Sequence, residues 1–432
     1  MVSVGRNRDA DLNVRDADLK VGATTCMFKF HLILLVTVGI LSSASAQQAR
    51  YDDVVRNLRN PDPKARMSSI SLLRESKYLE AIEPLAPLVN DPLDEIQLAA
   101  IDAELSFYLV EDVGARRRYA FIVEVRNAGR AETAFSSGPL ATWPRPLPAS
   151  LAASLLKAVD DENPKVRVEA IYTFGAIGTQ AAGEEHAEAL LRALDHYDPA
   201  IRAAAARVIG RLKVKSAGEA LIRAVNDSQD SVRFTAMRAL GEIGEVRAVQ
   251  ALTKQVEFYR KGEGAWSALD GLARIGHASS VPLFAARLAD RDAFVRRAAV
   301  EGLARAGAST EVTALETIAT SDSSKMVRAA ASFALQKLGK NYIARLVEPL
   351  DSSSMAPQIA GYFLELGQPA VAPLTSHLKD PDAAIRGNVA LILGAIGTSA
   401  QVPALEPLLT DRSEDVRRAA ERAMQRLKVR GA

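Results

Sequence analysis

Apolar and small residues recur at helical spacing along most of the chain. Val232 is followed by Ala236, Ala239 and Leu240, and these offsets place all four residues on one side of a helix. A shorter, Leu-rich segment at 220–225 comes before it. This pattern predicts a unit of two helices, a short one followed by a longer one. A glycine ends the longer helix in most copies, as expected at a helix C-terminus, at Gly178, Gly244, Gly276, Gly307, Gly339, Gly367 and Gly397.

The two-helix unit recurs with a period of about thirty-one residues. Its marker is an Arg that follows Val or Ile, with an Asp six residues earlier. Clear pairs are Asp161 and Arg167, Asp227 and Arg233, Asp290 and Arg296, Asp322 and Arg328, Asp380 and Arg386, and Asp411 and Arg417. Markers or their equivalents fall at Arg66, Gln97, Arg167, Arg202, Arg233, Ala265, Arg296, Arg328, Ala356, Arg386 and Arg417, which makes about eleven units. A fixed period of this length predicts a solenoid, which usually offers a surface to a partner.

Two units depart from the pattern. Residues 260–264, before Trp266, and residues 351–357, around Ala356, lack the Asp and the Val-Arg pair. We expect a local break in the Asp-Arg series at each of them, with a change of curvature.

An insertion of about forty residues, 106–148, separates an N-terminal array at 47–105 from a C-terminal array at 149–432. It contains three arginines at 116–118, an apolar run at 119–125 and a Pro-rich stretch at 143–148 that begins with Trp143. Long insertions inside an array are often functional. Two interpretations stay open: a loop packed over the ridge of the array, or a partner-binding segment.

The N-terminus has the features of a secretory signal peptide at 27–46. Lys29 precedes an apolar stretch at 30–41, and residues 44–46 form a small-residue cleavage site. We expect an exported protein, periplasmic or extracellular, cleaved near Ala46; the alternative is an uncleaved anchor. Residues 1–26 repeat Arg-Asp-Ala-Asp-Leu and do not suit a signal, so we interpret them as a non-native extension ahead of a start at Met27.

Composition narrows the function. The net charge of +2 gives no general attraction to nucleic acid or membrane. Cys26 is the only cysteine and precedes Met27. The mature chain therefore has no disulfide and no thiolate chemistry.

The recurring Asp, Val-Arg and Leu-Gly resemble the HEAT repeat, and in particular the HEAT-like repeats named after phycobilisome lyases, over roughly residues 50–105 and 149–428. The resemblance implies an all-α, right-handed α-α superhelix with an armadillo-type fold. It also implies a structural ladder of Asp and Arg through the stack. On the Asp side the ladder comprises Asp91, Asp161, Asp227, Asp290, Asp322, Asp380 and Asp411, and on the Arg side Arg167, Arg202, Arg233, Arg296, Arg328, Arg386 and Arg417. Asp suits the start of the second helix as a cap, and Arg has several donors with which to bridge neighbouring units.

Motifs for catalysis, cofactors or metals are missing from the sequence. His186, His196, His277 and His377 fall at unrelated repeat positions and not at ligand spacing. No phosphate loop and no nucleophile elbow occurs. We expect a protein that is not an enzyme and needs no cofactor. One alternative is a cofactor-handling relative such as a bilin lyase or deoxyhypusine hydroxylase, although no His here is followed by the Glu of the latter's iron-binding pairs. Another is a binder of an anionic envelope polymer; export makes nucleic acid unlikely.

Positions 3, 7 and 11 of the second helices point away from the buried stripe, and in HEAT-like solenoids this row lines the concave face. In the middle of the array this row is rich in Arg and exposed aromatic residues, the types enriched at binding hot spots. Tyr172 and Phe333 belong to this row, and its acidic members are Glu242, Asp270 and Glu301. The alternative is a solvent-exposed face of mixed charge that binds no partner. The predicted partner-binding residues are Arg207, Arg211, Phe234, Arg238, Trp266, Arg274, Arg297 and Arg305, together with Trp143 of the insertion. We expect a non-catalytic scaffold that binds a protein there. The basic last helix, residues 417–430, is interpreted first as a terminal cap and second as a contact for an anionic partner.

Overall fold

The computed structural model describes residues 50–110 and 129–431. The predicted extension at 1–26, the signal peptide at 27–46 and the insertion segments at 116–118 and 119–125 lie outside this part of the chain. The chain divides into two compact units, residues 1–73 and 74–432, which are described separately.

Eleven helices of the described residues carry the predicted markers, one for each expected unit. These second helices are α2 (Pro63–Glu75), α4 (Asp94–Tyr108), α7 (Pro164–Ile177), α10 (Pro199–Leu212), α12 (Asp230–Ile243), α14 (Gly262–Ile275), α16 (Ala293–Arg305), α18 (Lys325–Lys337), α20 (Ala356–Leu366), α22 (Ala383–Ile396) and α24 (Glu414–Gly431). The predicted all-α array of about eleven two-helix units is therefore confirmed.

A shorter first helix precedes each of them, often with a 3-10 turn at one end. Residues 50–57 form the first, and the others are α3 (Ile82–Leu85), α6 (Ala149–Lys157), α9 (Ala187–Leu194), α11 (Gly218–Ala224), α13 (Val249–Tyr259), α15 (Val281–Ala285), α17 (Val312–Ser321), α19 (Ile343–Val347), α21 (Val371–Thr375) and α23 (Val402–Leu405). Two further helices are α8 (Gln180–Glu185), before α9, and α5 (Arg130–Ser136), in the insertion. The described residues form no β-strand, only an isolated antiparallel bridge between Leu109 and Thr142.

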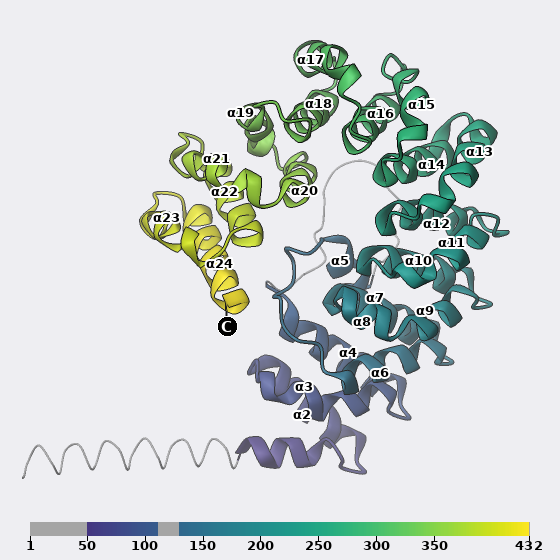
Figure 1. Cartoon of the computed structure of the whole chain (residues 1–432). Helices are drawn as coiled ribbons and strands as arrows, with labels where there is room; N and C mark the ends of the chain where they lie inside the picture. The colour runs from purple at the N-terminus through teal and green to yellow at the C-terminus, as the bar shows by residue number, and fades with distance from the viewer. Residues whose placement is uncertain (1–49, 111–128, 432) are drawn as a thin grey trace, which may run out of the picture. The chain divides into compact units, whose positions relative to one another are not determined.

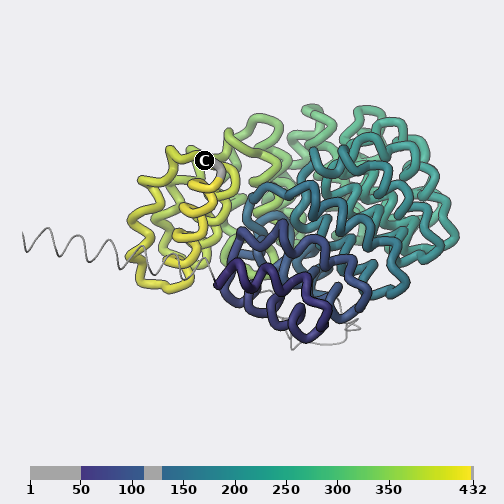
Figure 2. The backbone as a smooth tube through the Cα atoms, turned by 90° about the horizontal axis from the view of Figure 1, so that it is seen from below, coloured from purple at the N-terminus to yellow at the C-terminus, as the bar shows by residue number. Residues whose placement is uncertain are grey.

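Within residues 74–432 the second helices lie side by side in a curved row, and the first helices form the outer row (Figure 1). Within the same residues, the view turned by 90° also shows each two-helix unit packed against the next one along the chain (Figure 2). The core between the rows consists of small and aliphatic side chains, such as Ala236, Leu240 and Leu252, all fully buried. Each unit thus buries its apolar faces against its two neighbours, as expected for a solenoid.

Neighbouring second helices approach closely where both carry glycine. A Cβ on Gly241 of α12 would lie 2.7 Å from the Cα of Gly271 of α14. A Cβ on Gly271 would lie 2.4 Å from the backbone carbonyl oxygen of Met237. The sequence pattern assigned glycine to helix ends only, where Gly244 does end α12 with a φ of 66°. These interior glycines serve a different purpose, which is to let two backbones touch.

Glu104 of α4 is a fully buried acid without a compensating group. Its side chain is 0% exposed, and neither carboxylate oxygen has a hydrogen-bond partner among the described residues. Burial raises the pKa of Glu104 well above its ordinary value of 4.5, because a charged carboxylate is poorly solvated there. One turn later, the Tyr108 hydroxyl donates to the Pro146 carbonyl at 2.9 Å, so the neighbouring hydroxyl is already engaged.

This burial predicts that Glu104 makes the protein less stable as pH rises. The folded chain holds the proton more tightly than the unfolded chain, so the unfolded chain loses it first, from about pH 4.5 upward. The free energy of unfolding should then fall by up to about 1.4 kcal/mol per pH unit until Glu104 ionises in the folded chain as well. Glu104→Gln should remove this slope, making the variant more stable than the parent at neutral pH and nearly equal to it at pH 4.5.

The measurement is urea unfolding followed by circular dichroism at several pH values. Glu95→Gln is the matched control, because Glu95 is an exposed acid on the same helix. Parallel pH profiles for Glu104→Gln and the parent protein would contradict the assignment.

Candidate functional site

The Asp and Arg markers meet between neighbouring units. Arg296 of α16 donates to both carboxylate oxygens of Asp322 in the next unit, at 2.8 Å each. Its third nitrogen donates to the Asp290 carbonyl of its own unit at 2.8 Å. Hydrogen bonds from Arg296 lower the pKa of Asp322. The same two-pronged contact joins Arg202 to Asp227 and Arg386 to Asp411, and a single bond of 3.0 Å joins Arg167 to Asp198.

The ladder Asp does not cap the second helix, contrary to the prediction. The Asp227 carboxylate accepts from the backbone N–H of Gln229, which still precedes α12. The side chain that caps the helix belongs to the residue two positions after the ladder Asp: Asp292 accepts from Phe294 N–H, and Asp382 from Ala384 N–H. The ladder Asp therefore shapes the turn before the helix and receives Arg from the preceding unit.

The expected break in the Asp-Arg series occurs at the Trp266 unit, but other hydrogen bonds join the neighbouring units there. Arg233 donates to the Tyr259 hydroxyl at 2.8 Å, where an Asp stands in regular units. The Trp266 indole N–H donates at 2.7 Å to Asp292, the residue that caps the second helix of the next unit, and not to the ladder residue Asp290. At the Ala356 unit the series is also broken: within the described residues, the Arg328 guanidinium donates to the Asp322 carbonyl of its own unit and to no group of the next unit.

The insertion covers one end of the predicted binding row. Arg207 donates to Glu132 of α5 at 2.7 Å, to Ser136 at 2.9 Å and to the Tyr172 hydroxyl at 2.7 Å. Arg211 donates to the Phe135 carbonyl of α5 at 3.3 Å. These two predicted partner-binding residues are engaged by the chain itself. The described part of the insertion therefore packs over α7 and α10.

Helix α20 covers the other end of the row. The Tyr362 hydroxyl donates to Glu301 of α16, and the Tyr362 ring stacks on Phe333 of α18 with centroids 4.4 Å apart. Arg305 donates to Glu365 of α20 at 2.9 Å. Burial and the nearby Glu301 carboxylate raise the pKa of Tyr362 well above its ordinary value. The second helix of the Ala356 unit therefore packs against the inner side of α16 and α18.

Several row positions expected to face solvent are buried instead. Tyr172 is 6% exposed and Phe333 is 0% exposed, and the acids Asp270 and Glu301 are also buried. The prediction of exposed aromatic residues is wrong for Tyr172 and Phe333, because α5 covers the first and α20 the second. The prediction assumed that no other segment packs on the second helices, whereas α5 and α20 do.

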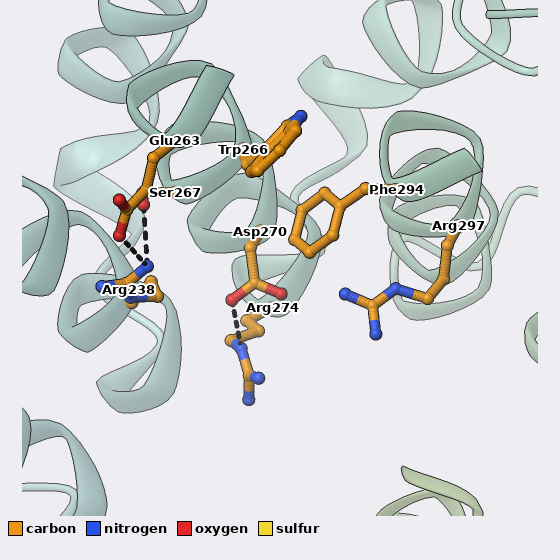
Figure 3. A pocket seen from close by; sticks show the side chains of 8 residues that line it. All are labelled: Arg238, Glu263, Trp266, Ser267, Asp270, Arg274, Phe294 and Arg297. Atoms are coloured by element: carbon orange, nitrogen blue, oxygen red, sulfur yellow. Dashed lines mark hydrogen bonds and ion pairs between the residues drawn. The ribbon is translucent and has the colours of Figure 1, made fainter. Parts of the chain in front are cut away.

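Between these two covers, α12, α14 and α16 form a pocket of about 360 Å³. Its lining residues are Arg238, Glu263, Trp266, Ser267, Asp270, Arg274, Phe294 and Arg297. Figure 3 shows Trp266 and Phe294 side by side above Asp270, with Arg238 on one side and Arg297 on the other. Four predicted partner-binding residues, Arg238, Trp266, Arg274 and Arg297, therefore meet at one site. Phe234 and Trp143, both half-buried, do not line the pocket.

The aromatic rings and arginines of the pocket are held in place. The rings of Trp266 and Phe294 lie 5.2 Å apart, and the Arg297 guanidinium lies 4.5 Å from the Phe294 ring centre. Arg274 donates to Asp270 at 2.8 Å, and Arg238 donates to the Ser267 hydroxyl at 3.0 Å. Since these contacts fix the side chains before any ligand arrives, binding requires little reordering.

Arginines decide the charge state of the pocket acid. Burial alone would raise the pKa of Asp270, but Arg274 and, further away, Arg297 and Arg305 outweigh burial and lower it. Next to the pocket, burial raises the pKa of Glu242 of α12 despite nearby Arg274 and Arg211. Asp270 is therefore a negative charge matched by Arg274, and the pocket as a whole has one more positive than negative side chain.

The residues Glu263, Ser267 and Phe294 were missed as candidates. Phe294 lies just inside the start of α16, and Ser267 is adjacent to Trp266 on α14. Neither occupies position 3, 7 or 11, so the row pattern does not select them. A weak signal existed in Phe294, which is an aromatic residue close in sequence to Arg297.

The described part of the chain offers neither a metal-binding cluster nor a membrane-spanning helix. Residues 50–110 and 129–431 contain no group of three or more His, Cys, Asp or Glu arranged to hold a metal ion. The histidines have local contacts: His196 accepts from the Asp198 N–H at 3.0 Å, and His277 from the Ser279 N–H at 3.3 Å. Within the same ranges, no helix has both the length and the hydropathy needed to cross a bilayer.

The last helix contacts the insertion, which lies far from it in the sequence. Arg426 of α24 donates to the backbone carbonyls of Pro139 and Thr142 in the insertion, at 2.6 and 2.7 Å. The basic face interpreted as a simple cap thus includes a residue that binds another part of the chain.

A comparison with known protein families identifies the repeats. The HEAT repeats family matches residues 187–257, 261–336 and 354–425, together just over half of the chain. Among solved structures, the complex of CpcE and CpcF of phycocyanin lyase from Nostoc sp. PCC7120 is similar, with 20% identity and a TM-score of 0.38 over 56% of this chain and 94% of that one. Importin beta in an ammonium sulfate condition is 18% identical with a TM-score of 0.35, over 88% of this chain and 50% of that one. No curated protein sequence matches this chain.

Proposed function

This chain belongs to the HEAT-repeat family, and we propose on that premise that it is a non-catalytic scaffold that binds a protein partner on the inner face of α12, α14 and α16. The proposal includes export, on the strength of the signal-like residues 27–46. A solenoid presents a long surface built from consecutive units, which suits protein recognition. The predicted partner-binding residues Arg207, Arg211 and Arg305 now serve as internal contacts that bound the surface.

The observation that carries the proposal is the open pocket between two covered stretches. Helix α5 packs over α7 and α10, and α20 packs over α16 and α18, whereas Trp266, Arg238 and Arg274 between them stay accessible. Tryptophan and arginine are the side chains most enriched among binding hot spots. Their surroundings also resemble a hot spot, because the exposed guanidinium groups flank a preorganised apolar wall.

The test is capture of a partner from an envelope extract by the immobilised protein. Replacing Arg238 and Trp266 together by alanine should abolish capture while leaving the helical circular dichroism signal unchanged. The matched control replaces Arg192 and Tyr197 by alanine, since both are exposed, at 59% and 79%, away from the pocket. This control should capture the partner normally.

Because Trp266 also bonds Asp292, Arg238→Glu alone serves as a second variant that leaves α14 unaltered. It should reduce capture at least tenfold, since a charge reversal at a hot spot costs more than about 1.4 kcal/mol. Undiminished capture by both variants would remove this surface from consideration.

A further inference from the structure

Two of the three most exposed charged groups that line the pocket are guanidinium groups, and the third is the Glu263 carboxylate. The side chains of Arg238 and Arg274 are 40% and 41% exposed, whereas Asp270 is 10% exposed. Arg274 binds Asp270 through Nε alone, and within the described residues its two terminal nitrogens make no hydrogen bond. Arg238 likewise binds Ser267 and Glu263 through one terminal nitrogen only. Each arginine therefore presents free N–H donors in the fork geometry that matches a carboxylate.

Glu263 is the exposed acid at the edge of the pocket that competes with an incoming carboxylate for Arg238. Its carboxylate lies 3.5 Å from Arg238 and its side chain is 60% exposed. An exposed ion pair of this kind is worth about 0–1 kcal/mol. An incoming carboxylate can therefore displace Glu263 from Arg238 at small cost, and the remaining positive charge favours an acidic ligand over a basic one.

The apolar wall sets the second requirement. Trp266 and Phe294 form a tilted aromatic pair beside the arginines, with centroids 5.2 Å apart (Figure 3). A third ring or a branched aliphatic side chain gains contact area there. The volume of about 360 Å³ lies at the small end of ligand sites, which suits one or two side chains and not a folded surface.

We propose that the pocket binds a short acidic peptide segment of the partner, with carboxylates on Arg238 and Arg274 and an aromatic or aliphatic side chain against Trp266 and Phe294. This inference rests on the proposed function and specifies the partner's chemistry. It commits to a peptide because the pocket is one part of a face that continues along three neighbouring helices, so flanking residues of a chain find further surface. A small aromatic carboxylate would use the same donors. The test distinguishes it from a peptide by comparing how tightly the two bind.

The test selects short random peptides on the full chain, with removal of those that also bind Arg238→Gln. Selected peptides should be rich in Asp and Glu and contain an aromatic or branched aliphatic residue. They should bind Arg238→Gln and Arg274→Gln at least about tenfold more weakly, the cost of losing a charged hydrogen bond. Arg274→Lys should recover part of the loss, because it keeps the charge without the fork. Higher salt should weaken binding.

Fluorescence reports the location directly. The chain has two tryptophans, Trp143 and Trp266, so in a Trp143→Phe background the emission comes from Trp266 alone. Acidic peptides should shift this emission, while the same peptides with Asn and Gln in place of Asp and Glu should not.

Three results would overturn the inference. Selected peptides that are neutral or basic would do so while leaving the docking surface intact, provided that capture still depends on Arg238 and Trp266. Phenylacetate or indole-3-acetate binding as tightly as the peptides would replace the peptide with a small molecule. No peptide discriminating between the parent and Arg238→Gln, together with undiminished partner capture by the Arg238 and Trp266 variants, would reject both the inference and the proposed function.

Discussion

Replacing Gly271 by valine is expected to destabilise the array by about 3 kcal/mol or more. A Cβ at this position would lie 2.4 Å from the Met237 carbonyl oxygen of α12 and 3.2 Å from a methyl group of Leu252. The nearer neighbour is backbone, so it moves only if the two helices separate. Because α12 and α14 pack along most of their length, that separation would expose apolar core on both sides.

Gly361 provides the matched control for this prediction. It lies inside α20, and a Cβ there would meet nothing within 4 Å. Gly361→Ala should therefore stabilise the protein by about 0.5–1 kcal/mol, the usual gain from replacing glycine in a helix interior. Urea unfolding followed by circular dichroism measures both variants. Similar effects of the two substitutions would show that the close contact between α12 and α14 has no energetic role.

The second large effect is expected from Arg296→Ala, which should lower the free energy of unfolding by about 2–4 kcal/mol at neutral pH. Arg296 and Asp322 are 12% and 8% exposed, so the substitution leaves a nearly buried carboxylate without its partner. It also removes the hydrogen bond to the Asp290 carbonyl, which ties the turn of the same unit.

The loss should depend on pH with a definite sign. Arg296 lowers the pKa of Asp322 in the folded protein below its ordinary value of 3.8. The resulting stabilisation is present above the unfolded pKa and is lost as pH falls through the folded pKa. The difference between Arg296→Ala and the parent should therefore shrink below about pH 4.

Arg192→Ala is the control for this experiment. Arg192 pairs with Glu188 within α9, and both side chains are exposed, at 59% and 91%. Its removal should change stability by less than about 0.5 kcal/mol at every pH. An Arg296 variant that behaves like the Arg192 variant would mean that the ladder contributes nothing to stability.

The repeat pattern was enough to predict the helices because the helical spacing of apolar residues is visible within each unit. An apolar residue at Val232 and its helical successors determine α12 without reference to any other unit. The Asp and Arg markers likewise predicted which side chains meet between units, as in the contact of Arg296 with Asp322. Local spacing and the regular stacking of units together supply this information.

Contacts between distant segments could not be predicted in the same way. Nothing in the spacing around Tyr172 or Phe333 shows that α5 and α20 will cover them. The bond between Trp266 and Asp292, which joins two units where the Asp-Arg series is broken, was equally hidden, because an indole N–H does not resemble the marker. The contacts of irregular units depend on segments that are close in space but distant in the sequence. A single sequence does not show which segments these are.

The pocket was predicted in part for the same reason. Arg238, Trp266 and Arg274 follow from the row of second helices, whereas Phe294 joins them only through the packing of α16 on α14. The arginines that the insertion and α20 engage, Arg207 and Arg305, could be separated from the free ones only with the structure in hand.

Site-specific photo-crosslinking tests the binding face most directly. A benzoyl-phenylalanine introduced in place of Trp266 lies in the pocket, and one in place of Tyr197 lies on a surface that is 79% exposed and away from it. Irradiation in the cells that make the protein should join a partner to the chain at position 266 and give no such product at position 197. Crosslinks of equal yield at both positions, or a product at 197 alone, would contradict the assignment of α12, α14 and α16 as the binding face.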